Sequence, residues 1–177
     1  MPTGHTMMAM TLDGFVARKD HALDWLMKFD TGSEDTGFTD FQNSIDVIVM
    51  GTGSFKTVLG FGEWPYRKPV VVLSKTLAED NIPEDVKDKV EISRLSPDQL
   101  MTQLDGRGVD RVYVDGGAII RSFLRAGYVA DMRIAIAPIL IGEGIRMFGE
   151  LDKDVDLRLE DVRRFGSDFV EMRYVVT

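Results

Sequence analysis

The sequence contains no cysteine and only two histidines, His5 and His21, among its 177 residues. Without cysteine the chain can form no disulfide, iron–sulfur cluster or zinc–thiolate site, and two histidines are too few for a histidine-rich metal centre. Aspartate and glutamate could still bind Mg²⁺ or Ca²⁺, but no EF-hand spacing is present. We therefore expect no metal site.

Positive charge and long apolar runs are also scarce. Lysine and arginine total 21 against 29 aspartates and glutamates, so the formal net charge is -8. Nucleic-acid binding needs clustered positive charge, and we expect none. The longest apolar candidate, residues 132–141, is interrupted by Arg133 and Pro138, which argues against a membrane span. The N-terminus lacks the basic start of a signal peptide, so we expect a cytoplasmic protein.

The composition that remains is that of one globular domain spanning residues 1–177. Hydrophobic residues make up 44% of the chain, and no linker, repeat or low-complexity stretch divides it. Short apolar runs predict buried strands. The predicted strands cover residues 6–10, 46–50, 70–73, 90–93, 112–114 and 132–141.

Predicted helices alternate with several of these strands, at residues 38–43, 97–105 and 118–126. Ser96 and Pro97 suit a helix start, and Gly127 suits a helix end. The alternation indicates an α/β fold with a mostly parallel central sheet flanked by helices. Two further strand-like runs, around residues 155–159 and at 169–176, follow one another without a helix, which predicts an antiparallel C-terminal edge. Ligands in such sheets bind beyond the carboxyl ends of the parallel strands.

Glycines stand at the ends of several predicted strands, and the most informative pair is in the segment Val112–Ile120, VYVDGGAII. Here a strand runs into Gly116 and Gly117, and a helix follows at once. Bare backbone and free N–H groups at a helix start suit a phosphate or diphosphate. On this reading, Gly117→Val should block the diphosphate and leave the fold largely intact. The alternative is a tight strand-to-helix turn without a ligand.

Three other strand ends give weaker indications of a binding site. Gly51-Thr52-Gly53-Ser54 offers N–H groups and hydroxyls, but a P-loop is excluded because Phe55 stands where glycine must precede Lys56. Ser74-Lys75 could hold an anion such as a ribose 2′-phosphate, or form an ordinary solvated loop. Gly142 and Gly144 either line a cleft or form a bend.

Taken in order, these segments resemble the dihydrofolate-reductase-like superfamily. The resemblance is strongest to stand-alone domains related to the C-terminal reductase domain of the riboflavin-biosynthesis bifunctional deaminase–reductase. It covers nearly the whole chain. The matching segments are MAMTLDGFVA at residues 8–17, LDWL at 23–26, VMGTGSF at 49–55, VLSK at 72–75, VDGGA at 114–118 and APILIGEG at 137–144.

The resemblance implies a mostly parallel sheet that binds a nicotinamide cofactor, normally NADPH, and a cis peptide bond between Gly116 and Gly117. Thr52 departs from the family pattern, which often has a basic residue there; Lys75 could compensate, and NADH stays open. The implied cofactor residues are Ala9, Val16 and Ala17 at the nicotinamide; Gly51, Thr52, Gly53 and Ser54 at the diphosphate and adenosine; Leu73, Ser74 and Lys75 at the adenine ribose; and Gly116, Gly117, Ala118 and Ile119 at the diphosphate.

Three residues are candidates for the substrate side. Asp30 follows Trp25 at a spacing like that of the carboxylate in dihydrofolate reductases, so it could act as an acid or anchor, or be solvated in a turn. Trp25 could stack on a ring or anchor the core. Arg146 could meet an acidic or phosphorylated substrate. The hydroxyl partner of folate reductases is not recognisable here.

These observations predict an NADPH-dependent reductase acting on a pyrimidine, a pterin, or a related carbonyl or imine compound. Two alternatives stay open: a genuine dihydrofolate reductase, and a nicotinamide-nucleotide-binding module without turnover. Exposed sheet edges and the apolar strand at residues 132–141 also favour a homodimer, as in related reductase domains.

Overall fold

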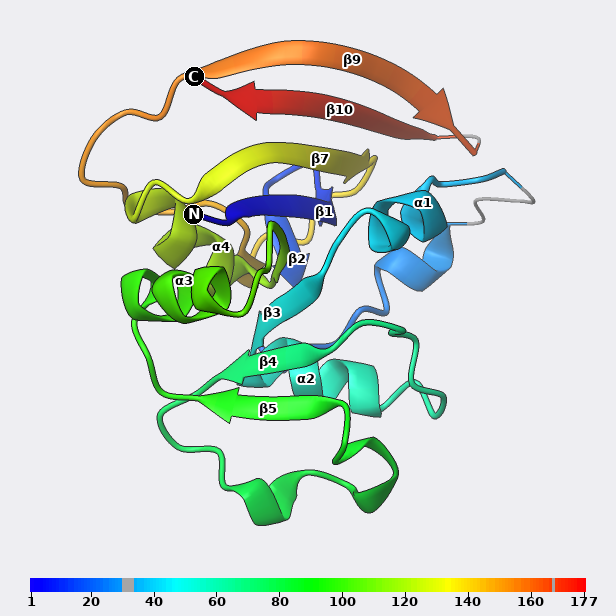
Figure 1. Ribbon diagram of the computed structural model, residues 1–177. Helices are drawn as coiled ribbons and strands as arrows, with labels where there is room; N and C mark the ends of the chain where they lie inside the picture. The colour runs from blue at the N-terminus through cyan, green and yellow to red at the C-terminus, as the bar shows by residue number, and fades with distance from the viewer. Residues whose placement is uncertain (30–33, 167) are drawn as a thin grey trace.

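The computed structural model describes residues 1–29, 34–166 and 168–177, and Asp30 therefore lies outside the described residues. Within this part of the chain, eight strands form one twisted sheet in the order β5-β4-β3-β6-β1-β7-β10-β9 (Figure 1). All neighbours are parallel except β10, which is antiparallel to both β7 and β9. This arrangement confirms the predicted parallel sheet with an antiparallel C-terminal edge. The strands are β1 (Thr3–Thr11), β3 (Val47–Gly51), β4 (Val70–Leu73), β5 (Val90–Ser93), β6 (Arg111–Asp115), β7 (Val129–Ala137), β9 (Leu157–Phe165) and β10 (Phe169–Val176).

Helices cover both faces of the sheet because its central strands are apolar on both sides. In β3, Val47 and Val49 pack in the cluster that holds α3 (Pro97–Gly106) and α4 (Gly117–Arg125). Ile48 and Met50 pack on the opposite face, under α1 (Phe38–Asn43) and α2 (Thr52–Leu59). The smaller elements are a ribbon of β2 (Phe15–Ala17) with β8 (Ile145–Arg146), and short 3-10 helices at Leu26–Lys28, Glu79–Asn81 and Glu84–Val86.

One predicted strand is too long. Strand β7 ends at Ala137, not at residue 141, because Pro138 has no backbone N–H to continue the ladder. The chain instead turns beside the β1–β2 connection. There the backbone N–H groups of Ile141 and Gly142 donate to Asp13 Oδ2 at 3.0 and 2.7 Å. Asp13 thus fixes the loop that leads into β8.

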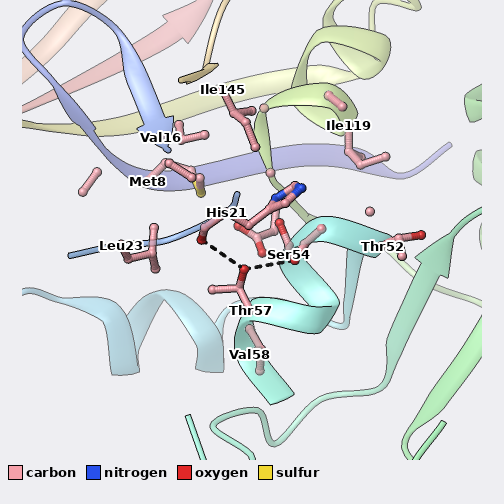
Figure 2. Close-up of a pocket in the computed structure, with 18 of the residues that line it drawn as sticks. Met8, Val16, His21, Leu23, Thr52, Ser54, Thr57, Val58, Ile119 and Ile145 are labelled. Atoms are coloured by element: carbon pink, nitrogen blue, oxygen red, sulfur yellow. Dashed lines mark hydrogen bonds between the residues drawn. The ribbon is translucent and has the colours of Figure 1, made fainter. Parts of the chain in front are cut away.

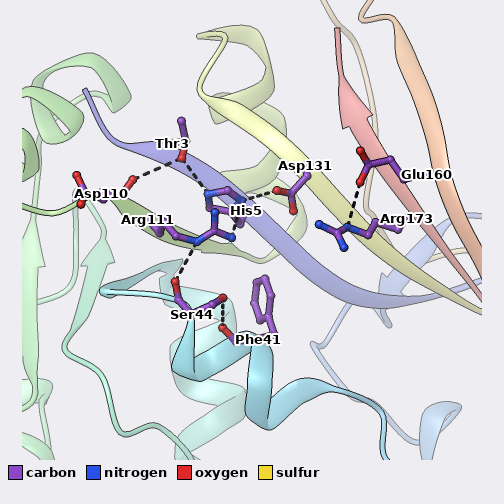
Figure 3. Close-up of polar contacts among 9 residues, drawn as sticks. All are labelled: Thr3, His5, Phe41, Ser44, Asp110, Arg111, Asp131, Glu160 and Arg173. Carbon is purple, nitrogen blue, oxygen red and sulfur yellow. Dashed lines mark hydrogen bonds and ion pairs between the residues drawn. The ribbon is translucent and has the colours of Figure 1, made fainter.

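A polar network at the N-terminal end of β1 joins this strand to β7 (Figure 3). His5 is buried, with its Nε2 2.9 Å from Thr3 Oγ1 and its Nδ1 2.7 Å from Asp131 Oδ2. Burial raises the pKa of Asp131, but the hydrogen bond and charge of His5 outweigh it and hold the pKa below its ordinary value. Both ring nitrogens of His5 are occupied, so this network ties β1 to β7.

The outer edge of the sheet leaves apolar side chains uncovered. Leu157, Leu159 and Val162 on β9 and Val170 on β10 are between 40% and 52% exposed. Strand β9 also has one unpaired edge in the sheet order. Exposed apolar edge strands are prone to pair with another chain. The sequence-based expectation of a homodimer rested partly on residues 132–141, but β7 lies between β1 and β10 inside the sheet. We propose that a homodimer would use the β9 edge instead. Over the described residues, no helix has the length and apolar composition to cross a membrane.

We predict that Val162→Glu shifts the protein to monomer in sedimentation velocity, because the new carboxylate would be buried against a second copy. Arg158→Glu is the control, since Arg158 pairs in register with Val175 and Val162 pairs with Met172, on the other side of the sheet. A wild-type protein that sediments as monomer at all concentrations would contradict the prediction.

Candidate active site

A cavity lies where the direction of the sheet connections reverses. The chain leaves β3 through α2 toward β4, and leaves the adjacent β6 through α4 toward β7 on the other side. Such a reversal opens a crevice at the carboxyl ends of the two strands. Met50 and Asp115 pair in register at these ends. A cavity of about 500 Å³ occupies this crevice (Figure 2).

Two helices begin at the cavity, one from each face of the sheet. Helix α2 starts after Gly51 and α4 starts after Gly116, and within the described residues no side chain caps either start. The first N–H groups of a helix have no partner inside the helix, and the helix dipole adds partial positive charge. The residues that begin both helices line the cavity. Two helix starts of this kind can bind an anion without a basic side chain.

The paired glycines at the start of α4 are both constrained by the protein's own packing. Gly116 has φ +90°, which disfavours other residues, and a Cβ there would lie 2.5 Å from Ser54 Oγ. A Cβ on Gly117 would overlap the backbone carbonyl oxygen of Arg146, which also accepts a hydrogen bond from Arg121. The prediction that Gly117→Val spares the fold is therefore wrong, because the space beside Gly117 is filled by the protein itself.

The expected cis peptide bond between Gly116 and Gly117 is also absent: among the described residues no peptide bond is cis. The positive φ of Gly116 turns the chain from strand to helix with trans peptides throughout. Glycine at residue 116 is needed for its backbone angle, and glycine at residue 117 for the close approach of β8.

One of the residues that line the cavity carries a buried carboxyl group. Asp115 ends β6, is 7% exposed, and accepts a hydrogen bond from Tyr113 at 3.3 Å. Burial raises its pKa to about 6, although hydrogen bonds from Tyr113, the Gly116 backbone and Ser54 oppose the shift. The pKa of Tyr66, another lining residue, is raised by burial and by the charge of Asp115. The cavity thus holds a carboxyl group that can exchange a proton near neutral pH.

The structure brings most of the predicted cofactor residues to this cavity. They are Ala9, Val16, Ala17, Gly51, Thr52, Gly53, Ser54, Leu73, Gly116, Gly117, Ala118 and Ile119. Ser74 and Lys75 are not among the lining residues. Ser74 Oγ instead accepts from the backbone N–H groups of Thr76 and Leu77 at 3.3 and 3.0 Å, and Lys75 is exposed.

The three substrate candidates have different outcomes. Trp25 lines the cavity and is also fully buried beside Phe169, so it serves the core and the wall at once. Among the described residues, its Nε1 finds no hydrogen-bond partner. Arg146 does not line the cavity; it is exposed, and its guanidinium lies 4.7 Å from the centre of the Phe15 ring. Asp30 lies outside the described residues.

Sequence reasoning missed several lining residues, and two of these are Asp115 and His21. Asp115 was visible as an acidic residue between a buried strand and two glycines, a position that parallel sheets place at the ligand crevice. His21 gave no sequence signal. It has φ +68°, and its ring packs so closely on Gly53 that a Cβ there would overlap it. The carbonyl of His21 also accepts from Thr57 at 3.5 Å, which holds this turn over the start of α2 (Figure 2).

Comparisons with known proteins agree with this geometry. The family described as RibD C-terminal domain matches residues 2–171. A putative riboflavin biosynthesis protein from Shewanella sp. PV-4 superposes with a TM-score of 0.92 and 32% identity, covering 99% of both chains.

Two more distant structures share the fold. The diaminohydroxyphosphoribosylaminopyrimidine deaminase/5-amino-6-(5-phosphoribosylamino)uracil reductase of Thermotoga maritima gives a TM-score of 0.74 at 15% identity, over 99% of this chain and 57% of that one. Dihydrofolate reductase from Enterococcus faecalis, complexed with NADP(H), gives 0.62 at 13% identity, over 99% and 96%. The chain belongs to the RibD C-terminal domain family and has the dihydrofolate-reductase-like fold.

Proposed function

We propose that this protein is a reductase that uses a nicotinamide dinucleotide, NADPH by preference, to reduce a small carbonyl or imine compound. The observation that carries the proposal is the convergence of two uncapped helix starts on one cavity that also contains a buried carboxyl group. Support comes from the family, and from solved structures of the same fold that include a 5-amino-6-(5-phosphoribosylamino)uracil reductase and a dihydrofolate reductase complexed with NADP(H).

The residues present fit a dinucleotide. The backbone N–H groups at the starts of α2 and α4 would hold the diphosphate between them. Leu73 lies at the end of the neighbouring strand β4, and the exposed Lys75 just beyond it could meet a 2′-phosphate. Ala9, Val16 and Ala17 would contact the nicotinamide. When bound, this group supplies a hydride.

The chain's own chemical contribution is a proton at Asp115. A carbonyl or imine that accepts a hydride must also gain a proton, and a carboxyl group with a pKa of about 6 is still partly protonated near neutral pH. The buried tyrosines Tyr66 and Tyr113 keep their protons over the same range, because burial raises the pKa of both. This proton source favours an enzyme over a binding module, which would need none.

The proposal is tested by titrating NADPH and NADH into the wild type and Thr52→Asp in a calorimeter. Thr52 begins α2, where a carboxylate stabilises the helix through its dipole but repels a diphosphate. We expect the wild type to bind NADPH, and Thr52→Asp to lose at least tenfold in affinity, about 1.4 kcal/mol, without loss of thermal stability.

The matched control is Ser96→Asp, which puts the same charge at the start of α3, away from the cavity. It should leave NADPH affinity unchanged. Absence of any binding heat with both nucleotides in the wild type would refute the proposed function.

A further inference from the structure

We infer that the hydride acceptor of this enzyme is an uncharged, planar carbonyl compound and not a sugar phosphate; the inference rests on the proposed reductase function. It is carried by the charge and the chemistry of the cavity wall. The cavity is large enough for a small aromatic ring, and its described lining contains no lysine or arginine for a second anionic ligand.

Among the described residues that line the cavity, none is lysine or arginine, and the ionisable ones are His21, Tyr66, Tyr113 and Asp115. The residues numbered 30–33 are Asp, Thr, Gly and Ser, so their sequence adds no cation. Moving a phosphate out of water costs free energy unless a charged or hydrogen-bonding group of the protein contacts it. A phosphorylated acceptor would also be repelled by the carboxyl group of Asp115 when it is ionised.

Lys56 and Lys75 are exposed and do not line the cavity, and three other cations near it already have partners. Arg18 pairs with Asp24 at 2.5 Å, and Lys19 pairs with Glu143 at 2.5 Å. Arg146 stacks on Phe15 outside the cavity. The two helix starts can bind an anion, and they flank the register pair at the ends of β3 and β6, where the dinucleotide's diphosphate would occupy both.

The rest of the wall is apolar and partly aromatic. On the side of α1 and α2 it is formed by Met7, Leu23, Leu26, Phe38, Val58 and Phe61 (Figure 2 shows Leu23 and Val58). Phe38 meets Tyr113 edge to face, with ring centres 6.5 Å apart. Aromatic and aliphatic walls of this kind favour flat, uncharged rings. Asp115 and Tyr66 are two of the polar lining residues, and we place the acceptor's carbonyl oxygen beside them.

The reaction balances with these groups. The acceptor's carbonyl carbon gains a hydride from the reduced nicotinamide, and the carbonyl π bond breaks. Its oxygen takes a proton from the Asp115 carboxyl group, so the products are an alcohol and the oxidised nicotinamide. Asp115 then regains a proton from water.

The test follows NADPH oxidation at 340 nm with three aldehydes that differ in one substituent: 4-methoxybenzaldehyde, 4-carboxybenzaldehyde and 4-formylphenyl phosphate. We expect kcat/KM for the neutral aldehyde to exceed that for each anion by at least tenfold. Phe61→Arg places a cation at the rim of the cavity, where Phe61 is 52% exposed, and should narrow that ratio several-fold. Phe148→Arg, at an exposed phenylalanine that does not line the cavity, should leave it unchanged.

The two proposals fail differently. If NADPH binds in the calorimeter but the phosphate aldehyde is reduced as fast as the neutral one, or the neutral one is not reduced at all, the acceptor class is wrong and the cofactor assignment stands. If NADPH does not bind, the reductase proposal fails and the acceptor class fails with it.

Discussion

Asp115→Asn is expected to make the protein more stable at pH 8 while lowering kcat at least a hundredfold. The folded-state pKa of Asp115 is raised to about 6 from an ordinary 3.8, chiefly by burial. Such a group contributes stability that is fully present below the unfolded pKa and is lost as the pH rises through the folded pKa. A pKa difference of two units corresponds to about 3 kcal/mol in the free energy of unfolding. The wild type loses this contribution as the pH rises above 6.

Asparagine carries no charge at any pH, and its carbonyl oxygen can still accept from Ser54, Tyr113 and the Gly116 backbone. Urea unfolding should therefore show the variant more stable by up to about 3 kcal/mol at pH 8, with a much smaller difference at pH 4.5. The wild-type kcat/KM should fall as the pH rises above about 6, and NADPH affinity should change little. Asp110→Asn, at an exposed aspartate, is the control. A variant with full activity would remove Asp115 from the chemistry.

Gly117→Ala is expected to destabilise the fold by roughly 3 kcal/mol, because a single added methyl group would overlap the backbone carbonyl of Arg146. That carbonyl is held by Arg121 and belongs to β8, which pairs with β2. Backbone on both sides cannot move aside as a flexible side chain can. Thermal and urea unfolding measure the loss directly, and any weakening of NADPH binding should follow the loss of folded protein.

Gly106→Ala is the matched control for this substitution. Gly106 ends α3 with a negative φ, and nothing lies within 4 Å of the position its Cβ would take. Alanine there should be neutral or stabilising by about 0.5 kcal/mol, because it lowers the entropy of the unfolded chain. If Gly106→Ala and Gly117→Ala changed the free energy of unfolding equally, the close approach of β8 to α4 would be contradicted.

Much of the fold could be predicted because it depends on local patterns. The strands at 70–73 and 90–93 and the helix at 38–43 have the predicted bounds, since short apolar runs and turn residues set them locally. The predicted strand at 132–141 was overextended because apolar residues continue past Pro138, and only the missing N–H ends the ladder there.

The site was predicted less evenly. Residues that follow strands, such as Gly51 and Gly116, reach the cavity because the carboxyl ends of neighbouring parallel strands share one edge. Arg146 did not, because its side chain stacks on Phe15 from a strand pair whose position local sequence does not specify. Asp115 acquires its raised pKa only from burial by distant segments.

The sequence alone determined the parallel sheet, its antiparallel edge and the glycine turns at the strand ends, because hydrophobic period, proline and glycine act over a few residues. Tertiary structure alone decided what those glycines face, which cations are already paired, and which carboxyl group is taken out of water. Those properties arise from atoms far apart in the chain: the Arg146 carbonyl beside Gly117, Glu143 beside Lys19, and Ser54 beside Asp115.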